Sequence, residues 1–466
     1  MMLFFALACG PKEAPLENPM SSAIPTVPPA KPFSPPEALI SQLPNKSSLW
    51  LHEDHRLPLV VFKIVLPGGG ASDPSGEWGR ADLVSEMLNE SVGELDTLEF
   101  ASLLNTAAAN YSVSTGRTST IVTLSLHRDR LEELLPIVAD AIYRPSFSEK
   151  DWDRVVENQI TSLEQMNEDA RSMASMYAGY FYHGTEHPLG SPLYGTVKTA
   201  AAVDREKSKS WHLSRLVGDQ ISFAIAGDIN AEDATKLIGK HFPDWPGTEF
   251  TAPSVPDNHT PANDSIVLID MPGAQQTTIR LSSSAYPKGS DLTVPAEVAG
   301  IVMGASFASR LNNLLREEKG YTYGIGCSFS EGVYGNSFSL STSVRTDATT
   351  PALQDIISTL ASAKEPYSEE DLMKGTKTLR TDVIDSVSSL SGIASVMTSS
   401  IQLKRSPNYG SQYLELARAV TTEDMLSAGP WFQPDKGIII IAGDANVIAQ
   451  PLTEAGFEIK RVELPQ

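Results

Sequence analysis

The chain contains one string with the spacing of a zinc-hydrolase motif, His-x-x-Glu-His, at residues 183–187. On a helix, two imidazoles one turn apart bind zinc, and the glutamate beside them activates a water molecule for hydrolysis. Gly184 lies inside this string and Pro188 follows it, so the segment is expected to end a helix rather than to form one. A zinc-binding glutamate on a following helix is also missing, because a proline-rich linker lies some 70 residues on. We expect His183 and His187 not to bind zinc; the alternative is a zinc hydrolase that uses them.

The two cysteines, Cys9 and Cys327, exclude a disulfide scaffold. Residues 1–9 form a short apolar run that ends in Cys9 and resembles the end of a bacterial lipoprotein signal, in which the cysteine is lipidated. The basic residues that should precede such a run are absent, so we expect a truncated signal; the alternative is an apolar terminus without lipidation. Residues 10–45 are rich in proline and are expected to form an extended tether. Cys327 is expected to be a small buried hydrophobe.

The composition limits the possible partners. The chain has 466 residues, with 36 Lys+Arg against 57 Asp+Glu, which gives a net charge of −21. Such a surface repels phosphate backbones and anionic headgroups, so nucleic acid is excluded as a partner and a membrane is expected only through the lipid anchor. No apolar run reaches the roughly 18–20 residues that span a bilayer. With the signal-like start, these features predict a bacterial envelope protein, periplasmic as a lipoprotein, or a secreted one.

The chain contains an internal repeat. Ile225–Asn230 recurs as Ile441–Asn446, at an offset of 441 − 225 = 216. Phe147–Asp151 recurs as Tyr367–Asp371, at an offset of 367 − 147 = 220, and both segments read as a loop whose serine caps a following helix. A looser match pairs the expected strands at residues 59–66 and 277–281. Three matches in one order at nearly one offset indicate a tandem duplication.

Each half has the same expected order of elements. The halves span residues 46–249 and 265–462, and a linker with several prolines, residues 250–264, joins them. Each reads as strand, helix, strands, long helices, strand and helix, which favours an antiparallel-rich sheet covered by helices on one face. The sequence therefore predicts the α+β class, with two tandem homologous domains.

Motifs in the first half resemble a known family. Gly68–Pro74 is followed by Gly79–Leu88, and His187–Thr196 contains a His-Pro-x-Gly segment. This pattern resembles the zinc peptidases of the pitrilysin/insulinase family, the inverzincins, which include the mitochondrial processing peptidase. The resemblance covers residues 46–460 and implies that the two domains form a clam-like half chamber.

The metal motif of that family is degenerate in this sequence. Active members carry His-x-x-Glu-His on the helix that follows Gly-x-Ala, and the corresponding positions are Asp82, Ser85 and Glu86. The third zinc ligand of the family aligns with Gln159. Two carboxylates without an imidazole make a poor zinc site, so we expect no metal in this chain and a solvated helix face in place of the lost site.

The second half resembles the C-terminal signature of the same family, with a Ser-Arg-Leu helix at residues 309–311 and a Gly-aromatic turn at residues 320–321. In the family, an arginine and a tyrosine seven positions later face the zinc, and Arg316 and Tyr323 match these positions (323 − 316 = 7). A guanidinium and a phenol supply donors where negative charge develops on the scissile carbonyl oxygen.

The resemblance thus implies half of an active site. Some bacterial members consist of two chains, of which one carries the metal and the other the Arg/Tyr pair, and this sequence resembles the second kind. We expect a heterodimer with a zinc-bearing homologous subunit that cleaves peptides, so that this chain neither binds zinc nor hydrolyses peptides alone. The alternative is a purely structural homologue without a substrate role.

Overall fold

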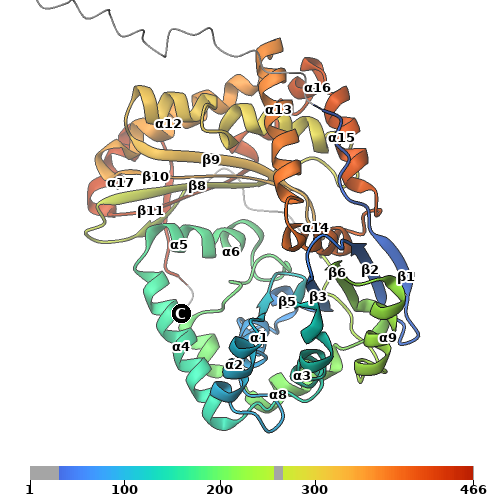
Figure 1. Ribbon diagram of the computed structural model, residues 1–466. Coiled ribbons are helices and arrows are strands. Elements are labelled where there is room, and N and C mark those ends of the chain that lie inside the picture. The colour runs from blue at the N-terminus through green and yellow to red at the C-terminus, as the bar shows by residue number, and fades with distance from the viewer. Residues whose placement is uncertain (1–30, 257–265, 465–466) are drawn as a thin grey trace, which may run out of the picture. The chain divides into compact units, whose positions relative to one another are not determined.

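The structure is a computed structural model that describes residues 31–256 and 266–464. Residues from Pro35 onward belong to one compact unit, which contains two six-stranded sheets (Figure 1). Residues up to Ser34 belong to a separate unit, of which only residues 31–34 are described. Cys9 and the signal-like segment lie outside the described residues. In the described part of the chain, no helix is long and apolar enough to cross a bilayer.

The first sheet has the strand order β1-β2-β6-β3-β5-β4. Neighbouring strands are antiparallel except for β2 and β6, which are parallel. The strands are β1 (Leu39–Gln42), β2 (Ser48–Glu53), β3 (Leu59–Pro67), β4 (Asn110–Thr115), β5 (Ser119–His127) and β6 (Ser222–Gly227).

The second sheet repeats this order as β12-β7-β11-β8-β10-β9. It differs at the outermost strand, because β12 is parallel to β7 whereas β1 is antiparallel to β2. A short turn joins β1 to β2, while β12 follows a helix, and this explains the opposite directions. The strands are β7 (Ile266–Asp270), β8 (Gln276–Ser284), β9 (Thr322–Ser330), β10 (Ser337–Arg345), β11 (Gly437–Gly443) and β12 (Ile459–Arg461). The tandem duplication and the α+β class predicted from the sequence are confirmed.

The helices of the first half are α1 (Arg80–Met87), α2 (Thr97–Thr106), α3 (Leu131–Tyr143), α4 (Glu149–Asn167), α5 (Ala170–Met176), α6 (Ala178–His183), α7 (Val197–Ala202), α8 (Arg205–Ser214) and α9 (Ala231–His241). Those of the second half are α10 (Thr293–Gly300), α11 (Arg310–Asn312), α12 (Thr349–Ala361), α13 (Glu369–Ser386), α14 (Leu390–Leu403), α15 (Tyr409–Ala419), α16 (Thr422–Ser427) and α17 (Ala445–Glu454). Ile301–Ala305 and Asn313–Glu318 are π-helical. The predicted serine caps are confirmed, because the hydroxyls of Ser148 and Ser368 accept hydrogen bonds from the backbone in the first turns of α4 and α13.

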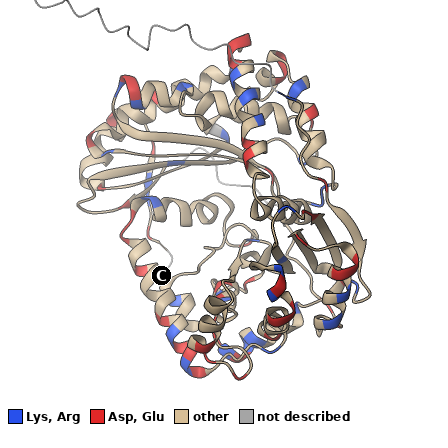
Figure 2. Cartoon of the chain, viewed as in Figure 1, with Lys and Arg blue, Asp and Glu red and all other residues tan. Residues whose placement is uncertain are grey.

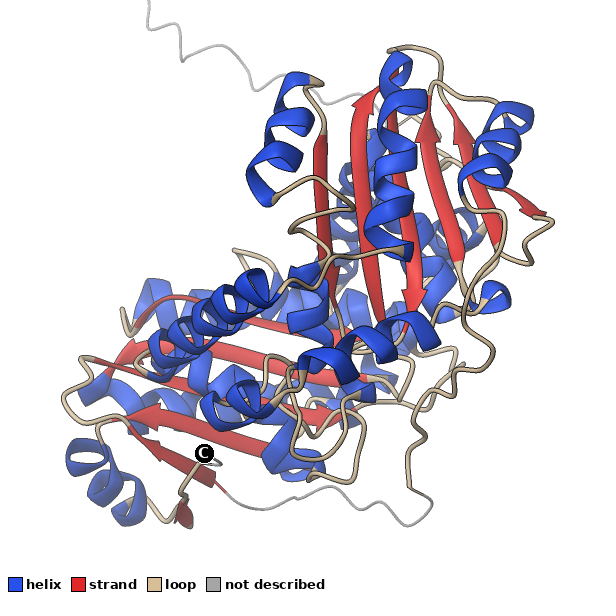
Figure 3. Ribbon diagram, turned by 90° about the horizontal axis from the view of Figure 1, so that it is seen from below, coloured by secondary structure: helices blue, strands red, loops and turns tan. Residues whose placement is uncertain are grey.

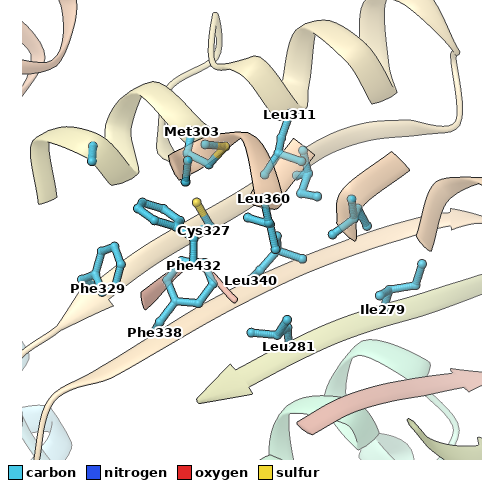
Figure 4. Packing of buried hydrophobic residues seen from close by; sticks show 14 of the residues in the cluster. Ile279, Leu281, Met303, Leu311, Cys327, Phe329, Phe338, Leu340, Leu360 and Phe432 are labelled. Carbon is cyan, nitrogen blue, oxygen red and sulfur yellow. The ribbon is translucent and has the colours of Figure 1, made fainter. Parts of the chain in front are cut away.

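Each half has its own apolar core between one face of its sheet and its own helices. In the second half the rings of Phe329 and Phe338 lie 4.9 Å apart, and Phe432 packs edge-on against Phe329. Figure 4 shows Cys327 beside these rings, under Met303. Cys327 is buried and unpaired, so the expectation of a small core residue is confirmed.

The opposite face of each sheet is covered by helices from the other half. α5 and α6 pack Met173, Tyr177 and Tyr182 against β7 and β11 of the second sheet. In return, α14 packs Ile393 and Met397 against the first sheet. Figures 1 and 3 show helices on both faces of the sheets, with α5 and α6 beneath β8 and β11. The prediction of helices on one face therefore describes only each half's own helices, and the exchanged helices join the two halves through apolar contacts.

The outer strands β4 and β9 are each held by an asparagine. The Asn89 amide bonds the backbone N–H of Val113 on β4 at 2.8 Å and its carbonyl at 3.2 Å. The Asn312 amide does the same for Ile325 on β9, at 3.1 and 2.8 Å. Each side chain thus satisfies backbone groups that an edge strand otherwise leaves unpaired. The same contact of an asparagine side chain with an edge strand, called a clamp below, therefore occurs in both halves.

Candidate functional site

The degenerate zinc motif lies on α1, which contacts β4, α4 and α8. Asp82 is 8% exposed and Ser85 is fully buried, whereas Glu86 is exposed. The prediction of a solvated helix face is therefore wrong for Asp82 and Ser85. The helix is enclosed by neighbouring elements on more than one side, so Asp82 and Ser85 are buried together with its apolar residues.

The pKa of Asp82 is strongly perturbed. Burial raises the pKa of its carboxyl to about 7, and the nearby Glu86 carboxylate acts in the same direction. A side-chain hydrogen bond from Gln159 on α4 opposes this shift. Gln159 also donates to the backbone carbonyl of Tyr194 at 2.9 Å. The structure thus brings Gln159 beside Asp82, where the family resemblance places a third metal ligand.

These residues do not suit zinc. Ser85 donates its hydroxyl to the backbone carbonyl of Asp82, and an amide stands in the third position. A catalytic zinc site needs three protein ligands, usually with imidazole among them. Across residues 31–256 and 266–464, no group of three or more His, Cys, Asp or Glu side chains is placed to hold a metal ion.

The motif around α1 has a structural role that does not involve a metal. The Asp73 carboxylate accepts hydrogen bonds from the backbone N–H groups of Gly79 at 2.8 Å and Ala81 at 2.9 Å, at the start of the helix. Burial raises the pKa of Asp73 to about 7. Gly79 has φ +93°, and a Cβ there would collide with the backbone of Tyr194. The Asp-Pro and Gly-x-Ala elements therefore fix the position of α1.

The literal His-x-x-Glu-His string does not form a helix. α6 ends at His183, and Gly184 follows with φ +72°. The rings of His183 and His187 are stacked, with centroids 4.1 Å apart and planes 11° apart. Nδ1 of the buried His187 accepts a hydrogen bond from the backbone of Leu189 at 3.0 Å. Stacked rings direct their nitrogens side by side rather than toward one ion, so this geometry does not favour the zinc alternative.

Arg316 and Tyr323 line one groove of about 920 Å³. Arg316 lies on the π-helical turn, with its guanidinium 4.1 Å from the ring centre of Phe307 and its Nε 3.3 Å from Glu317. Tyr323 lies at the start of β9 and is 91% exposed. The structure therefore brings the two matched residues together at the surface of the second half.

A β-bulge directs Tyr323 outward. Tyr323 and Gly324 lie opposite a single residue of β10, because Thr322 pairs with Val344 and Ile325 with Thr342. The hydroxyls of Thr322 and Thr342 both donate to the carbonyl of Gly324, at 2.9 and 3.0 Å. The bulge is thus fixed by side chains, so Tyr323 is presented to solvent from a rigid backbone.

Sequence reasoning missed the other residues of this groove. Asp169, Arg171 and Ser175 enter it from the first half, at α5, and Arg280 enters from β8. The signal for Arg280 was a charge in the middle of a strand whose neighbours are apolar. No local pattern marks Arg171, because it reaches the groove only through the exchange of α5 between the halves.

Two family models match the chain. The model described as "Insulinase (Peptidase family M16)" matches residues 51–196, and the one described as "Peptidase M16 inactive domain" matches residues 202–379. A non-peptidase homologue from Helicobacter pylori, YmxG, is 22% identical over 72% of this chain and 78% of its own length. An uncharacterized zinc protease from Mycobacterium leprae is 21% identical over 53% of this chain and 56% of its own length.

Solved structures show the same fold. An M16 inactive domain from Pseudomonas fluorescens superposes with a TM-score of 0.80 at 18% identity, over 87% of this chain and 97% of that one. A protease from Helicobacter pylori gives a TM-score of 0.76 at 13% identity, over 88% and 100%. These findings confirm the resemblance seen in the sequence. The chain belongs to peptidase family M16, the insulinase family, as a homologue whose described residues include no zinc-binding group.

Proposed function

We propose that this chain is the non-metal subunit of a two-chain peptidase and contributes Arg316 and Tyr323 to the active site of a zinc-bearing homologue. The observation that carries the proposal is that both side chains line one open groove, with the phenol of Tyr323 91% exposed. Phe307 in the same groove is 66% exposed. Exposed aromatic side chains at a groove are typical of surfaces that bind a partner or a ligand.

The chemistry assigned to the pair is binding of an oxyanion. Hydrolysis of a peptide bond places negative charge on the carbonyl oxygen, and donors that are already positioned there stabilise the transition state. The guanidinium of Arg316 supplies a charged donor and the phenol of Tyr323 a neutral one. The stacking of Arg316 on Phe307 and the bulge at Tyr323 support this role, because the first restrains the guanidinium and the second fixes the backbone that carries the phenol.

Substrate is proposed to bind as an extended peptide that pairs with a sheet edge. β4 and β9 are the outer strands at one edge of each sheet, and β9 also lines the groove. The clamps of Asn89 and Asn312 already occupy the backbone groups of Val113 and Ile325. A peptide therefore pairs with other residues of these strands.

The test is reconstitution with a zinc-bearing M16 homologue from the same source, with co-purification to identify that subunit. Removing one oxyanion donor is expected to lower kcat by about 10²–10³-fold, so Tyr323→Phe and Arg316→Ala should each lower turnover on this scale while the complex still assembles. Tyr334→Phe and Arg418→Ala lie outside the groove and are the matched controls. Turnover that is unchanged in both groove variants, or a chain that never associates with a metal-bearing subunit, favours the purely structural alternative.

A further inference from the structure

Arg280 lies in the middle of β8, on the face away from the core of the second half. Its neighbours Ile279 and Leu281 are buried in that core, and side chains alternate along a strand. Arg280 therefore points to the side of the sheet on which α5 packs, and its Nη1 lies 3.4 Å from the hydroxyl of Ser175 on that helix. This position places the guanidinium at the wall of the groove that contains Arg316 and Tyr323.

This guanidinium is partly buried without a carboxylate. Among the described residues Arg280 forms no ion pair, and its Nε is buried without a hydrogen-bond partner. Burial alone lowers its pKa, since no acidic group acts on it. A buried charge without a partner is unfavourable, and truly unsatisfied buried donors are rare in folded proteins. Because Nε is shielded from solvent, an anion in the groove would meet the Nη end of this guanidinium, whose contact with the hydroxyl of Ser175 is long at 3.4 Å.

The charged residues that line the groove are mostly basic. Arg171, Arg280 and Arg316 line it, with Asp169 as the one acidic lining residue. Asp169 is engaged at the start of α5, where its carboxylate accepts a hydrogen bond from the backbone of Ser172 at 2.7 Å. Glu317 pairs with Arg316, and the Asp169 carboxylate acts electrostatically on Arg171, whereas Arg280 forms no ion pair among the described residues. The groove is therefore locally cationic in a chain of net charge −21.

The floor of the groove has room for an extended segment. Arg280 pairs in register with Ser341 on β10, and Ser341 pairs with Gly326 on β9. This row across three strands ends in a small side chain and a glycine, both of which line the groove.

Figure 2 shows that the strand ribbons are mostly uncharged, with Lys and Arg interspersed with Asp and Glu along the helices. Arg280 on β8 has a counterpart in Lys63 on β3, and each of the two contacts a serine of the exchanged helix that covers its sheet, Ser175 on α5 and Ser395 on α14.

We propose that Arg280, assisted by Arg171, binds a carboxylate of an extended peptide, so that the groove selects acidic peptides. This proposal rests on the proposed function, because it names the substrate class of the same groove. A guanidinium matches a carboxylate with two parallel hydrogen bonds, and such charge-assisted pairs are the strong ones. The carboxylate comes from an Asp or Glu side chain or from a peptide C-terminus.

The net charge of the chain opposes this preference only at long range. Charges separated by more than about 8 Å are largely screened at physiological ionic strength, whereas a partly buried contact pair is screened much less. Repulsion by the acidic surface therefore slows the approach of an acidic peptide at low salt. The contact preference at Arg280 persists at physiological salt.

The experiment uses the full chain and fluorescence anisotropy with short labelled peptides that differ at one position. One peptide has a central Glu and an amidated C-terminus, the second has Gln in its place, and the third has Gln with a free C-terminal carboxylate. The wild-type chain is expected to bind at least one carboxylate peptide about 10- to 100-fold more tightly than the amidated Gln peptide. The stronger of the two identifies the source of the carboxylate.

Arg280→Gln is expected to abolish this preference and to leave the affinity for the amidated Gln peptide within about twofold. Arg171→Gln, at an exposed position, is expected to lower the preference by about two- to fivefold, and it serves as the second variant if Arg280→Gln fails to fold. Arg418→Gln on α15, outside the groove, is the control that should change nothing.

The outcomes separate the two proposals. If no peptide binds, both the carboxylate site and the peptide-binding role fail. If peptides bind but the Glu and Gln forms bind equally, or the preference survives in Arg280→Gln, the carboxylate site is refuted and the proposed function stands. If Arg280→Gln lowers the thermal midpoint and leaves the preference unchanged, Arg280 is structural and the inference is overturned.

Discussion

The buried carboxyl of Asp82 gives the degenerate motif a measurable consequence. Asp82 is 8% exposed, and burial together with Glu86 raises its pKa from 3.8 to about 7. Folding therefore favours the protonated carboxyl, so the contribution of Asp82 to stability is greatest at low pH and is lost as the pH rises through about 7. Asp82→Asn removes the titration and keeps an oxygen that accepts the hydrogen bond from Gln159.

The size of this pH-dependent change in stability follows from the pKa values of Asp82 in the unfolded and the folded chain. With 3.8 in the unfolded chain and about 7 in the folded one, ionisation of Asp82 costs about 4 kcal/mol at pH 8. At pH 5 the folded carboxyl remains mostly protonated, and the cost falls to about 2 kcal/mol. The free energy of unfolding of Asp82→Asn minus that of the wild-type chain should therefore rise by about 2–3 kcal/mol between pH 5 and pH 8.

Urea unfolding at these two pH values measures the difference, with Asp153→Asn on the exposed face of α4 as the matched control. Zinc and a chelator should leave both midpoints unchanged, since the residues around Asp82 do not suit the metal. The reasoning about Asp82 is refuted if its substitution gives the same stability change at both pH values. A wild-type chain that zinc stabilises at pH 8, with no effect on Asp82→Asn, would mean that Asp82 binds a metal.

Two further substitutions test the framework around the site. Asn312→Ala leaves the N–H and carbonyl of Ile325 without partners and should lower the free energy of unfolding by about 2–3 kcal/mol. The control Asn313→Ala, at an exposed position, should be nearly neutral. Equal effects of the two substitutions in urea unfolding would argue against the contact between Asn312 and β9. Ile393→Ala on α14 should cost about 2–4 kcal/mol through its contact with the first sheet, and the exposed Ser391→Ala should cost little. If Ile393→Ala is as stable as the wild-type chain by the same assay, the exchanged helix does not contribute to stability.

The features that sequence reasoning predicted well are local or repeated. Ser148 and Ser368 were recognised as caps because a serine at the start of an apolar-periodic segment bonds the backbone within its own turn. The strand at Leu59–Pro67 follows from a run of β-branched and apolar residues. The order of strands repeats because the sequence repeats, so the α+β class and the duplication can be predicted from the sequence.

The features that were missed depend on contacts between distant segments. The polar face of α1 suggested solvent, but β4, α4 and α8 enclose Asp82 and Ser85. The exchange of α5 and α14 between the halves leaves no periodic signal that distinguishes it from packing within one half. The sequence predicts only a strand around Arg280, because its position in the groove depends on α5.

The structure explains how an M16 fold is compatible with a helix that has lost its metal ligands. Hydrogen bonds from α1 to Asp73 and the left-handed backbone at Gly79 position this helix, and neither needs a metal ion. The exchanged helices hold the two halves together through apolar contacts that also do not involve the motif. A metal that binds an already folded site adds to stability by mass action but is not required for folding, in contrast to a small zinc-dependent domain. The first half can therefore lose zinc chemistry while it still supports α5, and α5 in turn completes the groove of the second half. This dependence gives the metal-free half a physical role in the site that we assign to Arg316, Tyr323 and Arg280.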